Sequence, residues 1–197
     1  MKTPYKKINE AFITLSSAVK QCMEQSNDNI IVAVDGRCGS GKTMLAELLQ
    51  KEYDCTLIHM DDFFLRPEQR TPERLAVPGE NIDHERFLTE VLYPLRNGES
   101  FSYRPYRCSA GKLGEPIYVT PKKLCIVEGS YSCHPCLRDY YQLKAFVTVN
   151  KEEQLQRIKA RSGAELAKRF KSVWIPLEEA YFLMCGVEES CDLVLET

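Results

Sequence analysis

Residues 36–43 read Gly36-Arg37-Cys38-Gly39-Ser40-Gly41-Lys42-Thr43, and this octapeptide decides the fold. It is a complete match to G-x-x-x-x-G-K-[ST], the loop whose backbone amides cradle nucleotide phosphates. An apolar, β-branched run over 30–34 precedes it, and residues 44–49 follow with the apolar spacing of a helix. Strand, glycine loop and helix is the order that the motif requires. The sequence therefore predicts a site for a nucleotide triphosphate, ATP or GTP.

The residue types in this loop suit phosphate chemistry. Its glycines allow the backbone to approach the ligand closely, and the helix that follows adds a partial positive charge at its first turn. We expect Lys42 to reach the β and γ phosphates and the Thr43 hydroxyl to ligate Mg²⁺. The residues expected to contact the nucleotide are Gly36, Cys38, Gly39, Ser40, Gly41, Lys42 and Thr43.

The composition of the 197 residues is that of one ordinary globular domain, with 44% hydrophobic and 27% charged residues. A net charge of −2 gives no electrostatic case for nucleic acid or an anionic membrane as the main partner. Residues 1–7 lead into a mixed amphipathic segment rather than a secretory apolar core, and no apolar stretch approaches a membrane span. We expect a cytoplasmic protein and leave open whether it forms a homo-oligomer.

Nine cysteines are many for this length, but an odd number argues against a disulfide framework. Cys133-His134-Pro135-Cys136 has the spacing of a redox pair or of half a zinc site. Because the chain has no second C-x-x-C, two incidental thiols in a loop is the favoured interpretation.

Apolar runs alternate with helical patterns along the chain. Helical spacing over 5–25 indicates a helix within an N-terminal extension of residues 1–28. Runs over 30–34, 55–60, 123–129, 143–149 and 191–195 predict strands. The alternation predicts a single α/β domain over 1–197 with the P-loop NTPase fold, a doubly wound parallel sheet with helices on both faces. Two short β patterns around a turn-rich segment predict an inserted hairpin over about 100–120.

Carboxylates follow two of the predicted strands. Asp61 and Asp62 come directly after 55–60, and Glu128 ends the next apolar run in the manner of a Walker B strand. Ligands of parallel sheets bind at this edge, so we expect Glu128 near Mg²⁺. Asp62 is a second candidate for the Mg²⁺ shell, through water, although capping of the next turn is the simpler role for it.

The chain resembles the uridine kinase and phosphoribulokinase family of P-loop kinases over about residues 29–195. The resemblance rests on an ordered set: the phosphate loop, Met60-Asp61-Asp62-Phe63-Phe64, Asn81-Ile82-Asp83-His84, Tyr103 and Tyr106 of the hairpin, Val127-Glu128-Gly129 and a basic helix from Arg157. It implies transfer of the ATP γ-phosphoryl group to a hydroxyl of a small metabolite, with Asp61 as the base. A carboxylate can orient a sugar hydroxyl and take its proton during transfer.

The same resemblance suggests residues for the acceptor. Asp83 matches a position that holds ribose hydroxyls, and a carboxylate accepts two hydrogen bonds from a vicinal diol. It also stands where an N-cap would precede a helix from His84, and both roles remain open. Tyr103 and Tyr106 either contact a planar acceptor ring or pack within the hairpin.

Arg157 and Arg161 lie four residues apart and would share one helix face. In similar kinases such arginines belong to a mobile lid, here about residues 157–172, that closes on the phosphates. We assign Arg161 a catalytic role and Arg157 a contact with the nucleotide. The alternative is a solvated helix face on which Glu153 pairs with Arg157.

The sequence departs from the nucleoside kinases where the acceptor is decided. Arg107 stands where those kinases commonly have Asp, no histidine follows through Leu113, and Ser162 replaces a usual Asp in the lid. We still predict a kinase that uses ATP or GTP with Mg²⁺ on a small-molecule acceptor, uridine or cytidine first. Nicotinamide riboside, pantothenate or a sugar phosphate are alternatives, and a nucleotide-dependent switch or scaffold is the alternative of another class.

Overall fold

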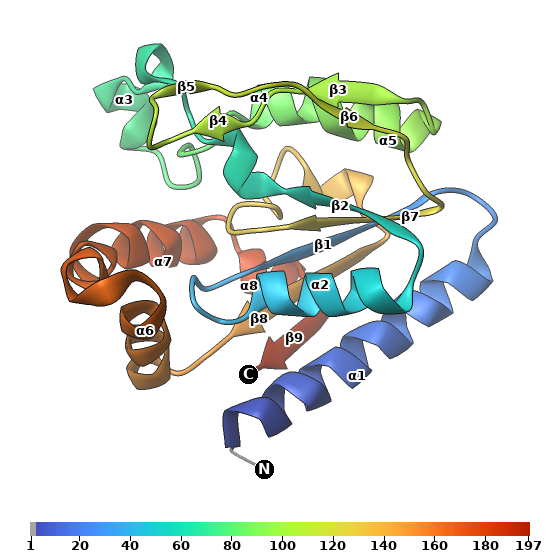
Figure 1. The fold of residues 1–197 in the computed structure, drawn as a ribbon, viewed down its shortest axis with the longest axis horizontal. Helices are drawn as coiled ribbons and strands as arrows, with labels where there is room; N and C mark the ends of the chain where they lie inside the picture. Colours follow the sequence, from blue (N-terminus) through green and yellow to red (C-terminus); the bar gives the residue numbers. More distant parts are fainter. Residues whose placement is uncertain (1–2) are drawn as a thin grey trace.

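A five-stranded, all-parallel sheet with the order β2-β7-β1-β8-β9 forms the centre of the protein (Figure 1). The computed structural model describes residues 3–197, with side chains from residue 6 onward. The strands are β1 (Ile30–Gly36), β2 (Cys55–His59), β7 (Leu124–Glu128), β8 (Leu143–Thr148) and β9 (Leu193–Glu196). All five correspond to apolar runs in the sequence, so the predicted parallel α/β fold is confirmed.

Helices cover both faces of this sheet. The longer helices are α1 (Thr3–Gln25), α2 (Lys42–Glu52), α6 (Lys151–Arg169) and α7 (Ile175–Met184). The short helical elements are η1 (Met60–Phe63), η2 (Pro67–Gln69), α3 (Pro72–Leu75), α4 (His84–Phe87), η3 (Leu88–Leu92), α5 (Tyr93–Asn97), η4 (Arg138–Tyr140), η5 (Phe170–Trp174) and α8 (Val187–Ser190). The helix predicted over 5–25 lies within α1, whereas residues 1 and 2 of the predicted extension lie outside the described residues.

The two faces of β1 belong to two separate apolar cores. Successive side chains of a strand point to opposite faces, so Ile30, Val32 and Val34 pack with α1 and α2. Ile31 and Ala33 pack on the other face with residues of α4, η3 and α7. Because both faces are covered, the central strands read as unbroken apolar runs rather than alternating ones.

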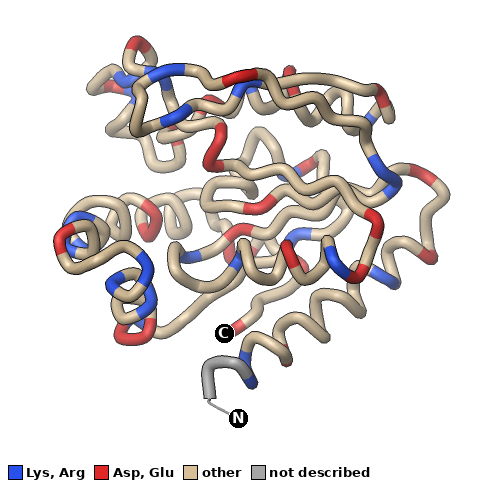
Figure 2. The backbone as a smooth tube through the Cα atoms, in the orientation of Figure 1, with Lys and Arg blue, Asp and Glu red and all other residues tan. Residues whose placement is uncertain are grey.

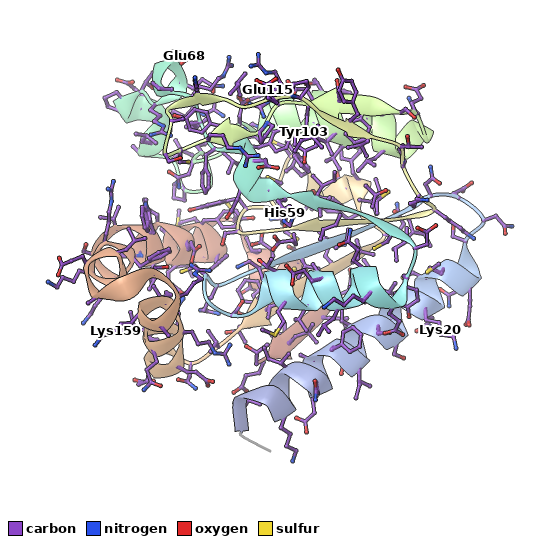
Figure 3. The ribbon with its side chains drawn as sticks, viewed as in Figure 1. Lys20, His59, Glu68, Tyr103, Glu115 and Lys159 are labelled. Atoms are coloured by element: carbon purple, nitrogen blue, oxygen red, sulfur yellow. The ribbon has the colours of Figure 1, made fainter. Side chains whose placement is uncertain are left out.

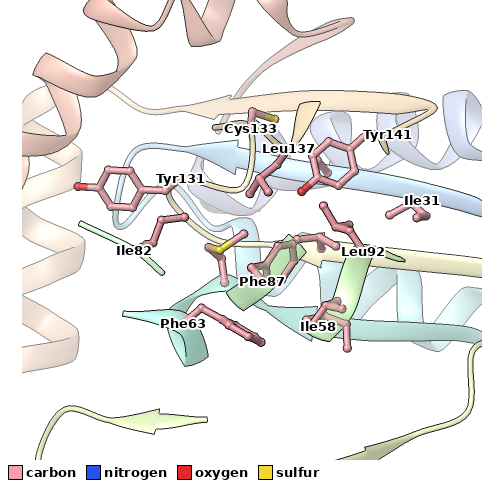
Figure 4. Packing of buried hydrophobic residues seen from close by; sticks show 14 of the residues in the cluster. Ile31, Ile58, Phe63, Ile82, Phe87, Leu92, Tyr131, Cys133, Leu137 and Tyr141 are labelled. Carbon is pink, nitrogen blue, oxygen red and sulfur yellow. The ribbon is translucent and has the colours of Figure 1, made fainter. Parts of the chain in front are cut away.

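The second core holds the turn after β2 in place (Figure 4). Phe63 of η1 is fully buried, and its ring meets that of Phe87 edge to face with centroids 4.9 Å apart. An edge-to-face pair of this kind adds about 0.5–1.5 kcal/mol to the burial of the two rings. The packing fixes the short helical turn that also carries Asp61 and Asp62.

Two small antiparallel pairs lie where the hairpin is predicted. β3 (Phe101–Tyr103) pairs with β6 (Ile117–Val119), and β4 (Tyr106–Arg107) pairs with β5 (Lys112–Leu113). In Figure 1 this ribbon lies beyond the β2 edge of the main sheet. The insertion therefore forms a wall beside the turn after β2.

The cysteines of the described residues are all free. Cys133 is buried, with its sulfur 3.9 Å from that of Cys191, whereas Cys136 is exposed. The C-x-x-C therefore does not form a disulfide here. Among residues 3–197 there is no helix of the length and apolar character needed to cross a membrane.

A buried carboxylate joins the central strand to its surroundings. Asp35 Oδ1 accepts hydrogen bonds from the backbone N–H groups of Gly36 (2.6 Å) and Tyr131 (3.2 Å). Its Oδ2 accepts from the Cys133 N–H (2.8 Å) and the Tyr181 hydroxyl (2.9 Å). Burial raises the pKa of Asp35 to about 6 against these donors, so the group is ionised above neutral pH.

Asp35→Asn is expected to lower the free energy of unfolding by about 2–4 kcal/mol at pH 7.5. The amide keeps the shape but turns an NH₂ toward groups that donate, leaving buried donors without partners. Urea unfolding measures the change, with Asp54→Asn as the control because Asp54 is exposed and pairs only with Lys122. An Asp35→Asn midpoint equal to that of the control would contradict this account.

Candidate nucleotide-binding site

The glycine loop connects β1 to α2 in the predicted order. Gly36, Gly39 and Gly41 have φ values of +131°, +75° and +97°, a region that residues with a Cβ rarely adopt. At Gly36 the constraint is also steric, because a Cβ would lie 2.0 Å from the Val147 main-chain oxygen of β8. The loop thus has the conformation that lets its amides converge on an anion.

Lys42 lies inside this loop rather than in solvent. Its Nζ donates to the main-chain oxygens of Gly36 (2.7 Å) and Arg37 (3.0 Å) and is 3.4 Å from the Ser130 hydroxyl. The side chain is buried, and no carboxylate lies within ion-pair distance of it among the described residues. A buried cation held only by neutral groups is the counter-charge that a triphosphate requires.

Thr43, in the first turn of α2, lies beside Glu128 at the carboxyl end of β7. The Thr43 hydroxyl donates to Glu128 Oε2 at 3.1 Å, and the other carboxylate oxygen is 2.6 Å from His59 Nδ1. This hydrogen bond raises the pKa of His59, whose role sequence reasoning missed. A hydroxyl and a carboxylate side by side are hard oxygen ligands of the type Mg²⁺ prefers, so these residues fit the predicted metal.

Asp61 lies beside the end of β7. A Cβ on Gly129 would come within 3.6 Å of Asp61 Oδ1, which places the carboxylate next to Glu128. Partial loss of hydration raises the pKa of Asp61, the charge of Lys42 lowers it, and the charges of Glu128 and Glu178 raise it further. The Asp61 side chain nevertheless remains exposed to solvent, within the electrostatic field of Lys42.

Asp62 points to the inserted ribbon instead. Its Oδ2 accepts from the Tyr103 hydroxyl at 3.2 Å, and Arg107 Nη1 is 3.4 Å from Oδ1. Figure 3 labels Tyr103 in the upper segment and His59 at the end of β2 below it. These contacts account for Asp62 without a metal, and its place in the Mg²⁺ shell stays a prediction.

Asp83 serves as the N-cap of α4. Its Oδ1 accepts from the Arg86 backbone N–H at 3.2 Å, and its Oδ2 accepts from Gln69 Nε2 at 2.8 Å with Arg66 Nη2 3.7 Å away. The side chain is 3% exposed. The capping role left open by the sequence is thus present, and the contact of Asp83 with an acceptor diol stays a prediction.

Tyr106 is also largely buried, with 4% of its surface exposed. The guanidinium of Arg70 lies over its ring, 5.5 Å from the centroid. The ring packs at the base of the inserted ribbon and lines a cavity there. Tyr106 is therefore placed beside the predicted acceptor region, mainly as a packing residue.

The lid arginines occupy different positions. Arg157 Nη1 donates to the Thr197 hydroxyl (2.9 Å) and contacts the Ser40 main-chain oxygen (3.3 Å), while Nη2 pairs with Glu153 at 2.8 Å. Arg157 thus supports the phosphate loop from behind and also makes the helix-face pair considered as the alternative. Arg161 is exposed, with its guanidinium 5.7 Å from the centre of the Phe170 ring.

The predicted lid contains a break in its helix. Within α6, Gly163 has φ 82° and ψ 167°, which is not a helical conformation. A Cβ at Gly163 would meet nothing within 4 Å. The two halves of α6 are therefore joined by a residue that the surrounding chain does not hold, and closure of residues 157–172 on a ligand stays a prediction.

One carboxylate at the loop, like His59, escaped sequence reasoning. Glu178 of α7 accepts from the Cys38 backbone N–H through Oε2 at 3.0 Å and from the Ser130 hydroxyl through Oε1 at 2.7 Å. The Glu178 side chain is buried, and one of the loop amides therefore already donates its hydrogen bond to a carboxylate of the protein. Burial, and then Glu178, raise the pKa of the Cys38 thiol, which leaves it protonated and unreactive.

A second group of possible metal ligands lies outside this site. His84, His134 and Cys136 each bring one nitrogen or sulfur atom within 4.8 Å of the others. The two imidazole rings are stacked at an interplanar angle of 12°, with centroids 4.4 Å apart. Because imidazole lone pairs lie in the ring plane, parallel stacked rings do not converge on one ion. Half of a zinc site is therefore not formed in this arrangement.

No protein-family model and no curated protein matches the sequence. Solved structures do. A possible uridine kinase from Bacillus stearothermophilus is similar with a TM-score of 0.68 at 16% identity, covering 96% of this chain and 99% of that one. A protein provisionally described as a fructose transport system kinase, from Silicibacter, has a TM-score of 0.69 at 19% identity and coverages of 90% and 97%.

A third structure, D-glycerate 3-kinase from Cryptococcus neoformans, has a TM-score of 0.58 at 18% identity, covering 88% of this chain and 87% of that one. Together with the sheet order and the glycine loop, these likenesses show that the chain has the fold of P-loop kinases. At sequence identities of 16–19%, the similarity shows the fold alone.

Glu178→Gln is expected to tighten ATP binding by about tenfold, because the γ-phosphate would no longer face a buried carboxylate at the Cys38 amide. Titration with a fluorescent ATP analogue and Mg²⁺ measures this. Glu165→Gln is the control, since it removes one charge from an exposed position of the lid. Unchanged or weaker binding by Glu178→Gln would show that this carboxylate does not compete with phosphate.

Proposed function

We propose that this protein is an ATP-dependent kinase that transfers the γ-phosphoryl group to a hydroxyl of a small metabolite. The observation that carries the proposal is the placement of Asp61. It is a solvent-accessible carboxylate beside the Thr43–Glu128 pair and within the field of Lys42. A loop that only binds nucleotide has no need of a base at this position.

Each of these residues has a distinct task in the proposed reaction. The loop amides and Lys42 would hold the phosphates, and Thr43 with Glu128 would hold Mg²⁺, which neutralises charge on the phosphates when bound. Asp61 would orient the acceptor hydroxyl and take its proton as the phosphoryl group transfers. Arg161, exposed on the lid, would add positive charge over the phosphates if the lid closes.

The identity of the acceptor is a further part of this proposal. The resemblance in the sequence favours uridine or cytidine, with nicotinamide riboside, pantothenate and sugar phosphates as alternatives. The similar structures support kinase chemistry without choosing among these acceptors, since they are described as a possible uridine kinase, a fructose transport system kinase and a D-glycerate 3-kinase. A nucleotide-dependent switch without acceptor is the second candidate function, and it would be favoured by tight ATP binding with no stimulated turnover.

The direct test is ADP release by the purified protein with Mg-ATP across a panel of acceptors: uridine, cytidine, nicotinamide riboside, pantothenate, ribulose 5-phosphate and D-glycerate. We expect at least one acceptor to raise turnover well above basal hydrolysis. A protein that binds ATP tightly but is stimulated by none of them would move the conclusion to the switch.

Asp61→Asn is expected to lower kcat by about 10²–10⁴-fold while leaving the dissociation constant for ATP within about twofold, because the change removes the base but no phosphate contact. Stimulated ADP release and nucleotide titration measure the two quantities. Asp54→Asn, far from the phosphate loop on an exposed turn, is the matched control. Equal loss in both variants would contradict the assignment.

The pH profile provides an independent check on the same residue. Since its surroundings raise the pKa of Asp61, the base should gain its proton at a higher pH than an ordinary Asp does. Turnover should therefore fall as the pH is lowered through that raised pKa. In Glu178→Gln the acidic limb should move to lower pH, because one of the charges that raises the pKa is gone. An unmoved limb would assign it to another group.

A further inference from the structure

The acceptor side of the site carries more cations than carboxylates. A cavity of about 410 Å³ beside Tyr106, open to solvent, is lined by Arg66, Arg104 and Lys112 and by one acid, Glu68, which lies 3.4 Å from Arg66. Figure 2 shows Lys and Arg positions, in blue, along α3 and the β4–β5 ribbon with Asp and Glu positions, in red, among them, and Figure 3 labels Glu68 at the outer end of this region. A small cavity with this balance of charge favours an anionic ligand.

Two of the cations have no carboxylate partner. Arg104 Nε donates to the main-chain oxygen of Gly114 at 2.7 Å, which holds the side chain and leaves its terminal amino groups for a ligand. Among the described residues, neither Arg104 nor Lys112 has a carboxylate oxygen within 4.0 Å. A guanidinium fixed by its Nε and free at its outer edge can bind a carboxylate or phosphate with two parallel hydrogen bonds.

The carboxylates that would recognise a neutral diol are already used. Asp83 caps α4 and accepts from Gln69, with Arg66 close to its second oxygen. Asp62 is held by Tyr103 and an arginine of the ribbon. Apart from Glu68, which lies 3.4 Å from Arg66, the charged groups that line the cavity are donors, whereas two sugar hydroxyls require an acceptor such as a carboxylate.

One short stretch joins this cavity to the proposed base. Tyr103 and Arg107 contact Asp62, the neighbour of Asp61, while Arg104 between them lines the cavity. Arg86 connects the two places, because its Nη2 donates to the main-chain oxygens of Arg104 (2.8 Å) and Asp62 (3.4 Å). The segment that lines the cavity is thus held against the turn that carries Asp61.

We propose that the acceptor is anionic: a hydroxyl compound with a carboxylate or phosphate group, held by Arg104 and Lys112 with Arg66 beside them. This inference rests on the proposed phosphoryl transfer and selects within it. It places carboxylated and phosphorylated acceptors ahead of the neutral nucleosides that the resemblance in the sequence favours.

The first test compares kcat/KM for ADP release among three kinds of acceptor. D-Glycerate and pantothenate carry a carboxylate, ribulose 5-phosphate carries a phosphate, and uridine and cytidine carry neither. We expect stimulation by an acceptor of one of the first two kinds, and which of them succeeds identifies the anionic group. Neutral nucleosides should give kcat/KM values lower by about tenfold or more.

The second test uses the double variant Arg104→Ala, Lys112→Ala with the best anionic acceptor. Its KM for that acceptor should rise by about tenfold or more with kcat little changed, because the lost contacts bind substrate and transition state alike. The KM for ATP should stay as it is. Lys20→Ala, which removes an exposed cation of α1 that lies near only Glu24, is the matched control and should change neither constant.

The outcomes separate the inference from the function on which it rests. A nucleoside that is phosphorylated as well as any anionic acceptor, or an unchanged KM in the double variant, would overturn the anionic class and leave the kinase standing. ATP binding with no stimulation by any acceptor would overturn the phosphoryl transfer and this inference with it.

Discussion

The phosphate loop depends on one buried carboxylate. Asp35 accepts four hydrogen bonds, from the first loop glycine, from two residues of the turn after β7 and from Tyr181 of α7. Three segments that supply the site are thereby fixed to one point of the central strand. A buried carboxylate is stable only while its hydrogen-bond donors stay in place. The four donors of Asp35 therefore hold their segments, and with them Glu128, Ser130 and Glu178, around the loop.

The nucleotide side and the proposed acceptor side of the site are held together by different structural elements. On the nucleotide side, the loop amides follow β1, Lys42 and Thr43 lie in the first turn of α2, and Glu128 ends β7, so the groups are anchored at one edge of the sheet. The acceptor side is made from short elements, η1, η2 and the inserted ribbon, linked by arginine contacts to main-chain oxygens. In such a site the rigid sheet positions the groups that bind the nucleotide, and the loops determine which acceptor is bound.

The sequence predicts the parallel sheet, the loop and the hairpin because each has a local signal: buried strands read as apolar runs, and glycines mark the turns. It also finds Thr43 and Glu128, since the ends of neighbouring parallel strands must meet. His59 and Glu178 carry no such signal. Glu178 lies in a helical stretch 140 residues beyond Cys38, and only the packing of α7 brings the two together. The choice between capping and binding at Asp83 likewise needed the position of Gln69.

Gly36 shows how a motif can conceal a different constraint. Its φ of +131° and the 2.0 Å approach of a Cβ to the Val147 oxygen belong to the junction of β1 with β8. The first glycine of the octapeptide is therefore required for assembly of the sheet as well as for the loop. An inactive variant at position 36 would thus reflect a disturbed fold before it reflected lost nucleotide binding, whereas a Cβ at Gly39 or Gly41 would meet only side chains or atoms more than 3 Å away.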